Sequence, residues 1–375
     1  MGFHASALPD FPWDSLAGAK RAAQAHPDGI VDLSVGTPVD PTPEVARRAL
    51  AEAADSPGYP LTVGTPELRA AMVRWFARRR GAHLTEAEVL PTIGSKEMVA
   101  HLPSLLGLGA GDVVVHPAQA YPTYDVGARL AGATPLPSDG GPEEWPDATR
   151  LVWVNSPGNP HGHVASVDRL RAIVAWARPR GVVVASDECY AELAWEEPWA
   201  SGGVPSLLDR RVCDGDHTGL LVAYSLSKQS NLAGYRAALL AGDSALVGAI
   251  REVRRHAGMM MPAPVQRAMA AVLDDDAHVS EQRERYRRRR AVLADAVRAA
   301  GLVLDPESVA GLYRWAHGEA PSVRIVDALA ERGILAAPGT FYGPAGEGWV
   351  RLALSATDER IDAAARRLEA SRLRL

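Results

Sequence analysis

A lysine directly after an apolar run is the first feature of this sequence that could do covalent chemistry. Lys228 lies in AYSLSKQSNLAGYR, residues 223–236, between Ser225 and the start of a polar turn. An amine withdrawn from water at a strand end can form a Schiff base with a carbonyl compound. Arg236, eight residues further on, could turn its planar N–H donors to an anion that Ser225 also binds. A solvated turn lysine and a surface arginine are the alternative, which the preceding strand and the following Gly-Tyr-Arg disfavour.

A carboxylate closes a second apolar run, VVVASDECYAEL, residues 182–193. Asp187 there needs a cationic partner if it is to stay charged, and a pyridinium nitrogen would be such a partner. Tyr190, three residues later, could donate to a phenolic oxygen on the same ring. Asp187 could equally cap a following helix, a common role for Asp after a strand. Taken alone, the segment does not separate these two interpretations.

A tight turn with an exposed amide follows a third apolar run, in WVNSPGNPHGHV, residues 153–164. The Pro-Gly and Asn-Pro pairs enforce the turn and present Asn159 at the strand end. Its amide could donate a hydrogen bond to the same phenolic oxygen as Tyr190. Most turns of this composition, however, have only a structural role.

These segments need a scaffold that brings them together. Short apolar runs alternate with helical patterns such as residues 167–177, which predicts a mainly parallel sheet covered on both faces. The runs cover residues 113–116, 151–155, 182–186, 220–224 and 237–241. Ligands bind at the carboxyl ends of strands in open sheets of this kind. Three consecutive strands therefore deliver their polar residues to one edge.

The order Asn-Pro-x-Gly, Asp-x-x-Tyr and Ser-x-Ser-Lys, with an arginine eight residues beyond, resembles the class I and II aminotransferases over nearly the whole chain. These are fold-type I enzymes that use pyridoxal 5'-phosphate. The resemblance implies that Lys228 binds the cofactor covalently and that Asp187 pairs with its pyridine nitrogen. It further implies that Tyr190 and Asn159 contact the ring hydroxyl. Ser225 and Arg236 would hold the phosphate, with Ser227 in the same site.

Two more segments resemble cofactor-binding parts of that family. TIGSKEMV, residues 92–99, resembles the turn whose backbone amides at Gly94, Ser95 and Lys96 receive the phosphate, as helix N-termini favour anions. Tyr121 in AYPTY resembles the aromatic residue that stacks on the pyridine ring. An isolated tyrosine would more often belong to a core or an interface.

Three residues resemble those that complete the family's substrate site. Arg351, in the apolar run WVRLAL, resembles the arginine that binds the substrate α-carboxylate, and without a partner it is hard to explain there. Gly36 in LSVGTP fits the segment that closes over this carboxylate, with Asn159 also expected at the substrate. Tyr59 resembles the tyrosine that reaches the phosphate of the neighbouring subunit, which implies a homodimer with shared active sites.

The chain is long enough for more than one lobe, and the pattern changes near residue 268. We expect an N-terminal segment, 1–40, that packs with a small domain, a large cofactor-binding domain over 41–267, and a smaller α+β domain over 268–375. Strands are predicted at 311–315 and 349–354, and helices at 322–332 and 359–373.

Composition excludes several classes of protein. Forty Lys and Arg against 45 Asp and Glu give a net charge of −5, which disfavours a nucleic-acid partner; the Arg-rich run at 283–290 is expected to be a solvated helix face. Two cysteines cannot build a disulfide framework or a Cys-based zinc site, and His161 with His163 is not expected to bind metal. No run approaches the roughly 20 apolar residues of a membrane helix, and the start lacks a signal-peptide pattern. We therefore expect a cytoplasmic protein without membrane partners.

The resemblance implies transamination between an amino acid and a keto acid. The opening segment, GYPLTVGTPELR and TIGSKE look like actinobacterial N-succinyldiaminopimelate aminotransferases of lysine biosynthesis, with glutamate as the other substrate. Arg254 or Arg255 could bind the distal carboxylate, although both could equally be solvent-facing. An aspartate or aromatic aminotransferase, a carbon–sulfur lyase of the same fold and a non-catalytic regulator domain remain as alternatives.

Overall fold

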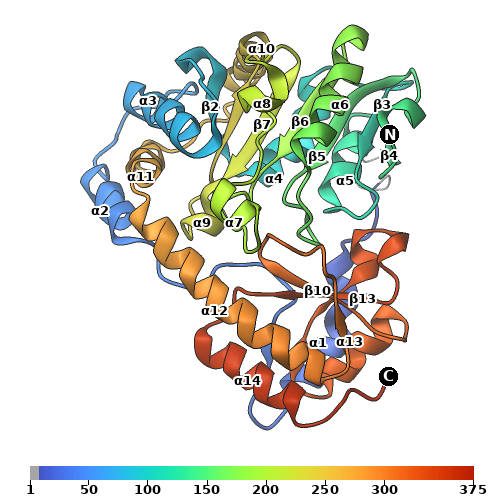
Figure 1. Cartoon of the computed structure of the whole chain (residues 1–375). Coiled ribbons are helices and arrows are strands. Elements are labelled where there is room, and N and C mark those ends of the chain that lie inside the picture. Colours follow the sequence, from blue (N-terminus) through green and yellow to red (C-terminus); the bar gives the residue numbers. More distant parts are fainter. Residues whose placement is uncertain (1–7) are drawn as a thin grey trace, which may run out of the picture.

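A seven-stranded sheet forms the larger part of the molecule in the computed structural model, which describes residues 8–375 (Figure 1). Its strands, in spatial order, are β2 (Val89–Ile93), β8 (Ala237–Gly242), β7 (Leu220–Ser225), β6 (Val183–Asp187), β5 (Thr149–Asn155), β3 (Val113–His116) and β4 (Thr134–Pro137). The strands from β7 to β4 are parallel to one another, which confirms the mainly parallel sheet.

One strand departs from the prediction of parallel pairing. The run at 237–241 forms β8, which is antiparallel to both β7 and β2. The segment between β7 and β8 is too short to hold a crossover helix, so the chain must turn back beside the strand it has just left. The sequence patterns also missed β2 and β4. Both contain proline, which weakens a strand signal and suits positions at a sheet edge.

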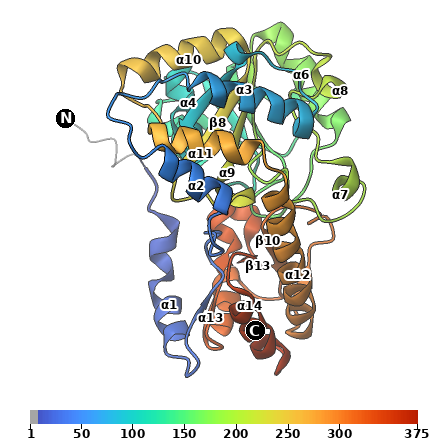
Figure 2. The same cartoon turned by 90° about the vertical axis from the view of Figure 1, so that its left-hand side faces the viewer.

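Helices cover both faces of this sheet (Figures 1 and 2). They are α2 (Glu44–Glu52), α3 (Pro66–Trp75), α4 (Ser95–Leu105), α5 (Thr123–Leu130), α6 (Val167–Ala177), α7 (Trp199–Gly202), α8 (Arg210–Cys213), α9 (Leu226–Gln229), α10 (Ser244–His256) and α11 (Ala263–Leu273). Side chains of α3, α6, α8 and α11 belong to one hydrophobic cluster, and those of α4, α5 and α10 to another.

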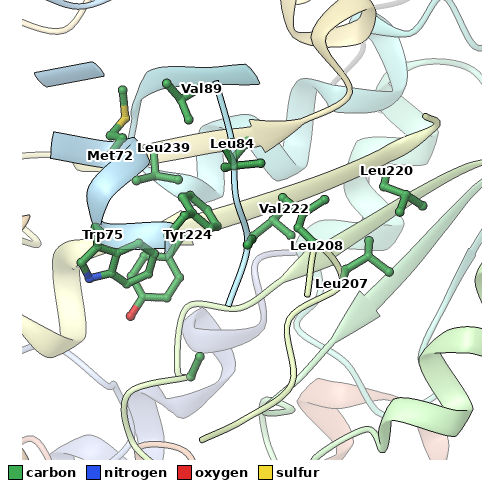
Figure 3. Close-up of a cluster of buried hydrophobic side chains, with 14 of the residues drawn as sticks. Met72, Trp75, Leu84, Val89, Leu207, Leu208, Leu220, Val222, Tyr224 and Leu239 are labelled. Atoms are coloured by element: carbon green, nitrogen blue, oxygen red, sulfur yellow. The ribbon is translucent and has the colours of Figure 1, made fainter. Parts of the chain in front are cut away.

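Alternation along the central strands divides their side chains between the two clusters. Val222 and Tyr224 of β7 enter the first cluster, in which Tyr224 packs on Trp75 with ring centroids 4.4 Å apart (Figure 3). Leu221, directly before Val222, points to the other face and enters the second cluster. A strand with both faces buried must read as a continuous apolar run, which is why β7 ends abruptly at its first polar residue.

The rest of the chain builds a second layer around a four-stranded antiparallel sheet, β12-β13-β10-β9. Its elements are α12 (Ala277–Ala299), β9 (Val303–Leu304), β10 (Tyr313–His317), α13 (Ser322–Ala330), β11 (Ile334–Leu335), β12 (Ala337–Pro338), β13 (Trp349–Ala353) and α14 (Asp358–Glu369). The N-terminal α1 (Ala17–Gln24) packs on α13, and β1 (Val31–Asp32) pairs with β11 (Figure 2).

The proposed domain limits at residues 40 and 268 stay a prediction, and residues 1–7 of the N-terminal segment lie outside the described part of the chain. α11, which spans the second of these limits, packs on α2 and α3 beside the large sheet. Within residues 8–375, no helix is both long enough and apolar enough to span a bilayer.

Candidate active site

The carboxyl ends of β5, β6 and β7 meet at one edge of the large sheet, as expected. Asn155 is paired with Asp187, and Asp187 with Ala223, so the polar segments after these strands start side by side. They open into a cavity of about 370 Å³ whose far wall comes from β10 and β13. Twelve of the predicted site residues line it: Gly36, Ser95, Lys96, Tyr121, Asn159, Asp187, Tyr190, Ser225, Ser227, Lys228, Arg236 and Arg351.

Lys228 reaches this cavity from α9, a single helical turn after β7. The Ser225 hydroxyl accepts a hydrogen bond from the Ser227 amide at 3.2 Å and so starts this turn at the last residue of the strand. The Lys228 ammonium donates to the backbone oxygen of Gly36. Burial lowers the pKa of Lys228 below its ordinary value, which makes the neutral, nucleophilic amine easier to reach.

Asp187 is a buried carboxyl group without a cationic partner among residues 8–375. Tyr124 donates to Oδ2 at 2.9 Å, and the backbone N–H of Cys189 donates to Oδ1 at 3.1 Å. Burial raises the pKa of Asp187, because the cost of desolvation exceeds the effect of these donors. The chain continues in turns after Asp187, so no helix is there for it to cap. A protonated ring nitrogen would supply the missing charge.

Two elements converge at the opposite end of the cavity. Gly94 precedes the N-terminus of α4 with a φ of 83°, and a Cβ at this position would lie 2.7 Å from Arg236 Cζ. Only glycine therefore lets the guanidinium lie against the start of the helix. Arg236, which donates to Ala233 O at 3.0 Å, and the N-terminus of α4 together present N–H donors that could bind an anion such as a phosphate.

Arg351 lies on β13, at the wall opposite the large sheet, and its side chain is buried. Its Nη1 donates to Asn159 Oδ1 at 2.9 Å and its Nη2 to Ser34 O at 2.6 Å. Asn159 thus uses its side-chain oxygen on Arg351, which leaves its Nδ2 to donate into the cavity. No carboxylate within residues 8–375 neutralises Arg351, so an anion from solution would be bound with little competition.

A family model described as aminotransferase class I and II matches residues 28–368. The chain belongs to this family. It is 57% identical to a probable aminotransferase of Mycobacterium tuberculosis over 97% of this chain and 86% of that protein. It is 54% identical to the 4-dedimethylamino-4-oxo-anhydrotetracycline transaminase OxyQ of Streptomyces rimosus, over 96% of this chain and 99% of that protein. Among solved structures, a probable N-succinyldiaminopimelate aminotransferase of Thermus thermophilus is 30% identical. Its TM-score is 0.84, and the match covers 96% of this chain and 100% of that one.

Class I and II aminotransferases use pyridoxal 5'-phosphate, and the fold is that of the fold-type I transferases. The cavity fits this cofactor in three separate ways. It has a buried amine at Lys228, a buried carboxyl group without a counter-charge at Asp187, and the anion site that Gly94 leaves open to Arg236.

Two predicted residues lie outside the cavity lining. Gly94 lies directly behind it and shapes it through its missing Cβ. Tyr59 is 95% exposed and does not line the cavity. Its predicted role requires a second subunit and stays a prediction.

Several residues of the aminotransferase cavity were missed by the sequence analysis. They include Phe11, Trp13, Tyr124, Asn155, Cys189 and Tyr313. Tyr124 was within reach of prediction, because it follows Tyr121 by one helical turn. Phe11 and Tyr313 were not, because they come from segments that only the tertiary fold brings to the sheet edge.

Other sequence interpretations need correction. Arg254 is fully buried and pairs with Glu97 at 2.8 Å, whereas Arg255 is exposed; neither lines the cavity, so neither is in place to bind a distal carboxylate there. The expectation of a solvated Arg-rich face at 283–290 is wrong for Arg289, which is buried and ion-paired with Asp40 and Asp358.

The pair His161 and His163 lies beside a second hollow, away from Lys228. His163 Nε2 lies 2.7 Å from Asp305, and burial together with His163 lowers the pKa of His161 to about 3. No group of three or more possible metal ligands occurs within residues 8–375.

We expect Lys228→Ala to abolish covalent attachment of pyridoxal 5'-phosphate, because the amine of Lys228 is withdrawn from water beside the Gly36 oxygen, whereas Lys96 is exposed. The sequence has only three lysines, so borohydride reduction followed by peptide mass spectrometry gives an unambiguous assignment. Lys20→Ala is the control and should label like the wild type. Cofactor fixed to Lys96 in the wild type would contradict the assignment.

We expect Gly94→Ala to weaken binding of pyridoxal 5'-phosphate to the apoenzyme about 10- to 100-fold, since the methyl group would displace Arg236 from its anion site. Gly203→Ala is the matched control: its φ of 75° and ψ of 156° are close to the 83° and 150° of Gly94 and impose similar backbone strain, but a Cβ there contacts nothing within 4 Å. Titration followed by absorbance measures both. Equal losses in the two variants would show that strain, and not Arg236, is responsible.

Proposed function

We propose that this aminotransferase exchanges the amino group between glutamate and 2-oxoglutarate on one side and N-succinyl-2-amino-6-ketopimelate and N-succinyl-LL-diaminopimelate on the other, in lysine biosynthesis. The likeness to the Thermus thermophilus protein supports the substrate class. The observation that carries the proposal is an unused cation in the cavity, at Lys96.

Lys96 is a cationic side chain of the cavity that has no assigned anion. Arg236 is assigned to the cofactor phosphate and Arg351 to the α-carboxylate. Its side chain lies at the cavity lining, with Nζ 5.6 Å from the ring centre of Phe11 and 5.5 Å from that of Tyr121. No carboxylate within residues 8–375 forms an ion pair with it. Its backbone amide can still face the phosphate, so the ammonium is free for a second anion. A substrate with a distal carboxylate would supply that anion.

The residues of the cavity divide the work of transamination. Bound pyridoxal 5'-phosphate supplies an exchangeable carbonyl carbon and an electron-poor ring that accepts the electron pair of the Cα–H bond. Arg351 holds the α-carboxylate and thereby aligns this bond. Lys228, once its amine is free, removes the α-proton as general base and returns a proton one carbon away. Asp187 would keep the ring nitrogen of the cofactor protonated, and Tyr190 would donate a hydrogen bond to its ring oxygen.

Both half-reactions use the same site, so the keto acid leaves before the second one binds. This requirement separates the proposal from a carbon–sulfur lyase, which would release ammonia and pyruvate without any keto acid as acceptor. The intact Lys228 disfavours a non-catalytic regulator.

A second candidate is amination of a ketone on a polycyclic compound. The Streptomyces rimosus relative, named for such a substrate, is more similar in sequence than the Thermus thermophilus protein. A hollow of about 720 Å³ also adjoins the cavity and shares Phe11 and Tyr121 with it. Its apolar wall would suit a ring system better than a succinyl chain. We rank it second, because an uncharged ring system would leave Lys96 without an anion.

We expect single-turnover spectra to show fast loss of the pyridoxal absorbance with N-succinyl-LL-diaminopimelate and with glutamate, and slow loss with aspartate and phenylalanine. Lys96→Met should raise the KM for the succinylated substrate 10- to 100-fold, because a charged hydrogen bond is lost, and leave the KM for alanine within two-fold. Lys20→Met is the control. Fast reaction with aspartate or phenylalanine alone would contradict the pathway and leave the family assignment intact.

We also propose a homodimer in which Tyr59 reaches the neighbouring phosphate. The exposed side chains of Tyr59 and Leu61 support an interface there. Sedimentation of the holoenzyme should give a dimer. Tyr59→Phe should weaken cofactor binding several-fold and leave the dimer intact. A fully active monomer would rule this arrangement out.

A further inference from the structure

Tyr313 occupies the junction between the carboxylate end and the cofactor end of the site. It opens β10, is 5% exposed and lines the cavity. The pairing of β10 with β13 places Trp315 opposite Arg351, so Tyr313 lies diagonally across from that arginine. Its ring centre is 3.8 Å from Arg351 Cζ, and its hydroxyl oxygen is 3.1 Å from that of Tyr190. No sequence motif pointed to it.

The ring of Tyr313 solves a problem that Arg351 poses. Arg351 is buried, and its hydrogen bonds go to an amide oxygen and a backbone oxygen, which carry no full charge. A carboxylate beside it would neutralise it but would also occupy the donors that a substrate needs. The faces of Tyr313 and, at 4.9 Å, Tyr342 stabilise the cation without using a single N–H.

The hydroxyl of Tyr313 sets the direction of the Tyr190 proton. Burial, followed by the proximity of Tyr313, raises the pKa of Tyr190 well above its ordinary value, so Tyr190 stays neutral and has one O–H to donate. If Tyr190 donates into the cavity, the bond between the two hydroxyl groups must run from Tyr313 to Tyr190. A hydroxyl group that accepts one hydrogen bond becomes a stronger donor in its own, so Tyr190 would donate more strongly into the cavity.

Gly36 keeps this hydroxyl in place. A Cβ at Gly36 would lie 2.9 Å from Tyr313 Cζ, so the tyrosine packs directly on the backbone whose oxygen accepts from Lys228. The ring and the hydroxyl of Tyr313 are therefore fixed together, between Arg351, Tyr190 and Gly36.

We propose that Tyr313 is a positioning residue for the reaction: its ring face holds the Arg351 guanidinium ready for the α-carboxylate, and its hydroxyl donates to Tyr190, which then directs its own proton to the cofactor oxygen. This inference rests on the proposed function, in which Arg351 binds the substrate carboxylate.

Two substitutions separate the two roles. Tyr313→Leu removes the ring and should weaken glutarate binding to the apoenzyme about ten-fold by calorimetry. Tyr313→Phe keeps the ring and should leave this binding within two-fold. In the holoenzyme, Tyr313→Phe should move the pH midpoint of the cofactor absorbance by about half a unit. The shift should have the same direction as that of Tyr190→Phe and be smaller.

Tyr342→Phe is the matched control, because Tyr342 also packs beside Arg351 but its buried hydroxyl has no hydrogen-bond partner within residues 8–375. It should change neither glutarate binding nor the midpoint. Equal glutarate affinities in Tyr313→Leu and the wild type would overturn the role of the ring. An unchanged pH midpoint of the cofactor absorbance in Tyr313→Phe would overturn the role of the hydroxyl. If Arg351→Lys binds glutarate as the wild type does, the carboxylate site of the proposed function fails instead, and the midpoint still decides the hydroxyl.

Discussion

Burial of charge without a counter-charge from the protein is the constraint on which this site depends. Lys228, Asp187 and Arg351 are all buried, and none has an ion-pair partner within residues 8–375. Desolvated ions of this kind cost several kcal/mol each unless something neutralises them. The scaffold offsets part of this cost with hydrogen bonds. Tyr124 donates to Asp187, Lys228 donates to the Gly36 oxygen, and Arg351 donates to Asn159. The rest is left for the ligands: a protonated ring nitrogen would face Asp187, a substrate carboxylate would face Arg351, and Lys228 would bond covalently to the carbonyl carbon of the cofactor.

The two sheets share this task in different ways. The large sheet is buried on both faces and rigid, and it fixes the lysine and the aspartate at the ends of adjacent strands. The four-stranded sheet brings Arg351 and Tyr313 from the opposite wall. The N-terminal segment adds Gly36 and the Ser34 oxygen between the two walls. Binding of a carboxylate therefore draws on all three parts of the chain at once.

Local patterns in the sequence were sufficient for several elements of the large sheet and its covering helices. The strand at 113–116 and the helix at 167–177 have the predicted limits, because hydrophobic periodicity alone determines them. The direction of β8 could not be read in this way, since it depends on the length of a connection and not on the strand itself. Arg254 was misjudged because its partner, Glu97, lies on another helix far away in the sequence.

The same limit applies to the cavity wall. The family resemblance supplied twelve of the residues that line the cavity, whereas Tyr313 and Phe11, which also line it, carry no motif. A tyrosine at the start of a short strand has the same local sequence signal whether it faces solvent, core or ligand. Only the pairing of β10 with β13 decides which of these it faces.

The reversal of β8 has a consequence for how this protein can vary. Lys228 and Arg236 lie on one short excursion between two central strands, each of which is paired on both sides. In the proposed function, this excursion sets the spacing between Lys228, which would bond to the aldehyde carbon of the cofactor, and Arg236, which would hold its phosphate. An insertion there would change that spacing. We therefore expect differences in chain length at the walls that meet the substrate, where specificity can diverge without altering the residues that would bind the cofactor.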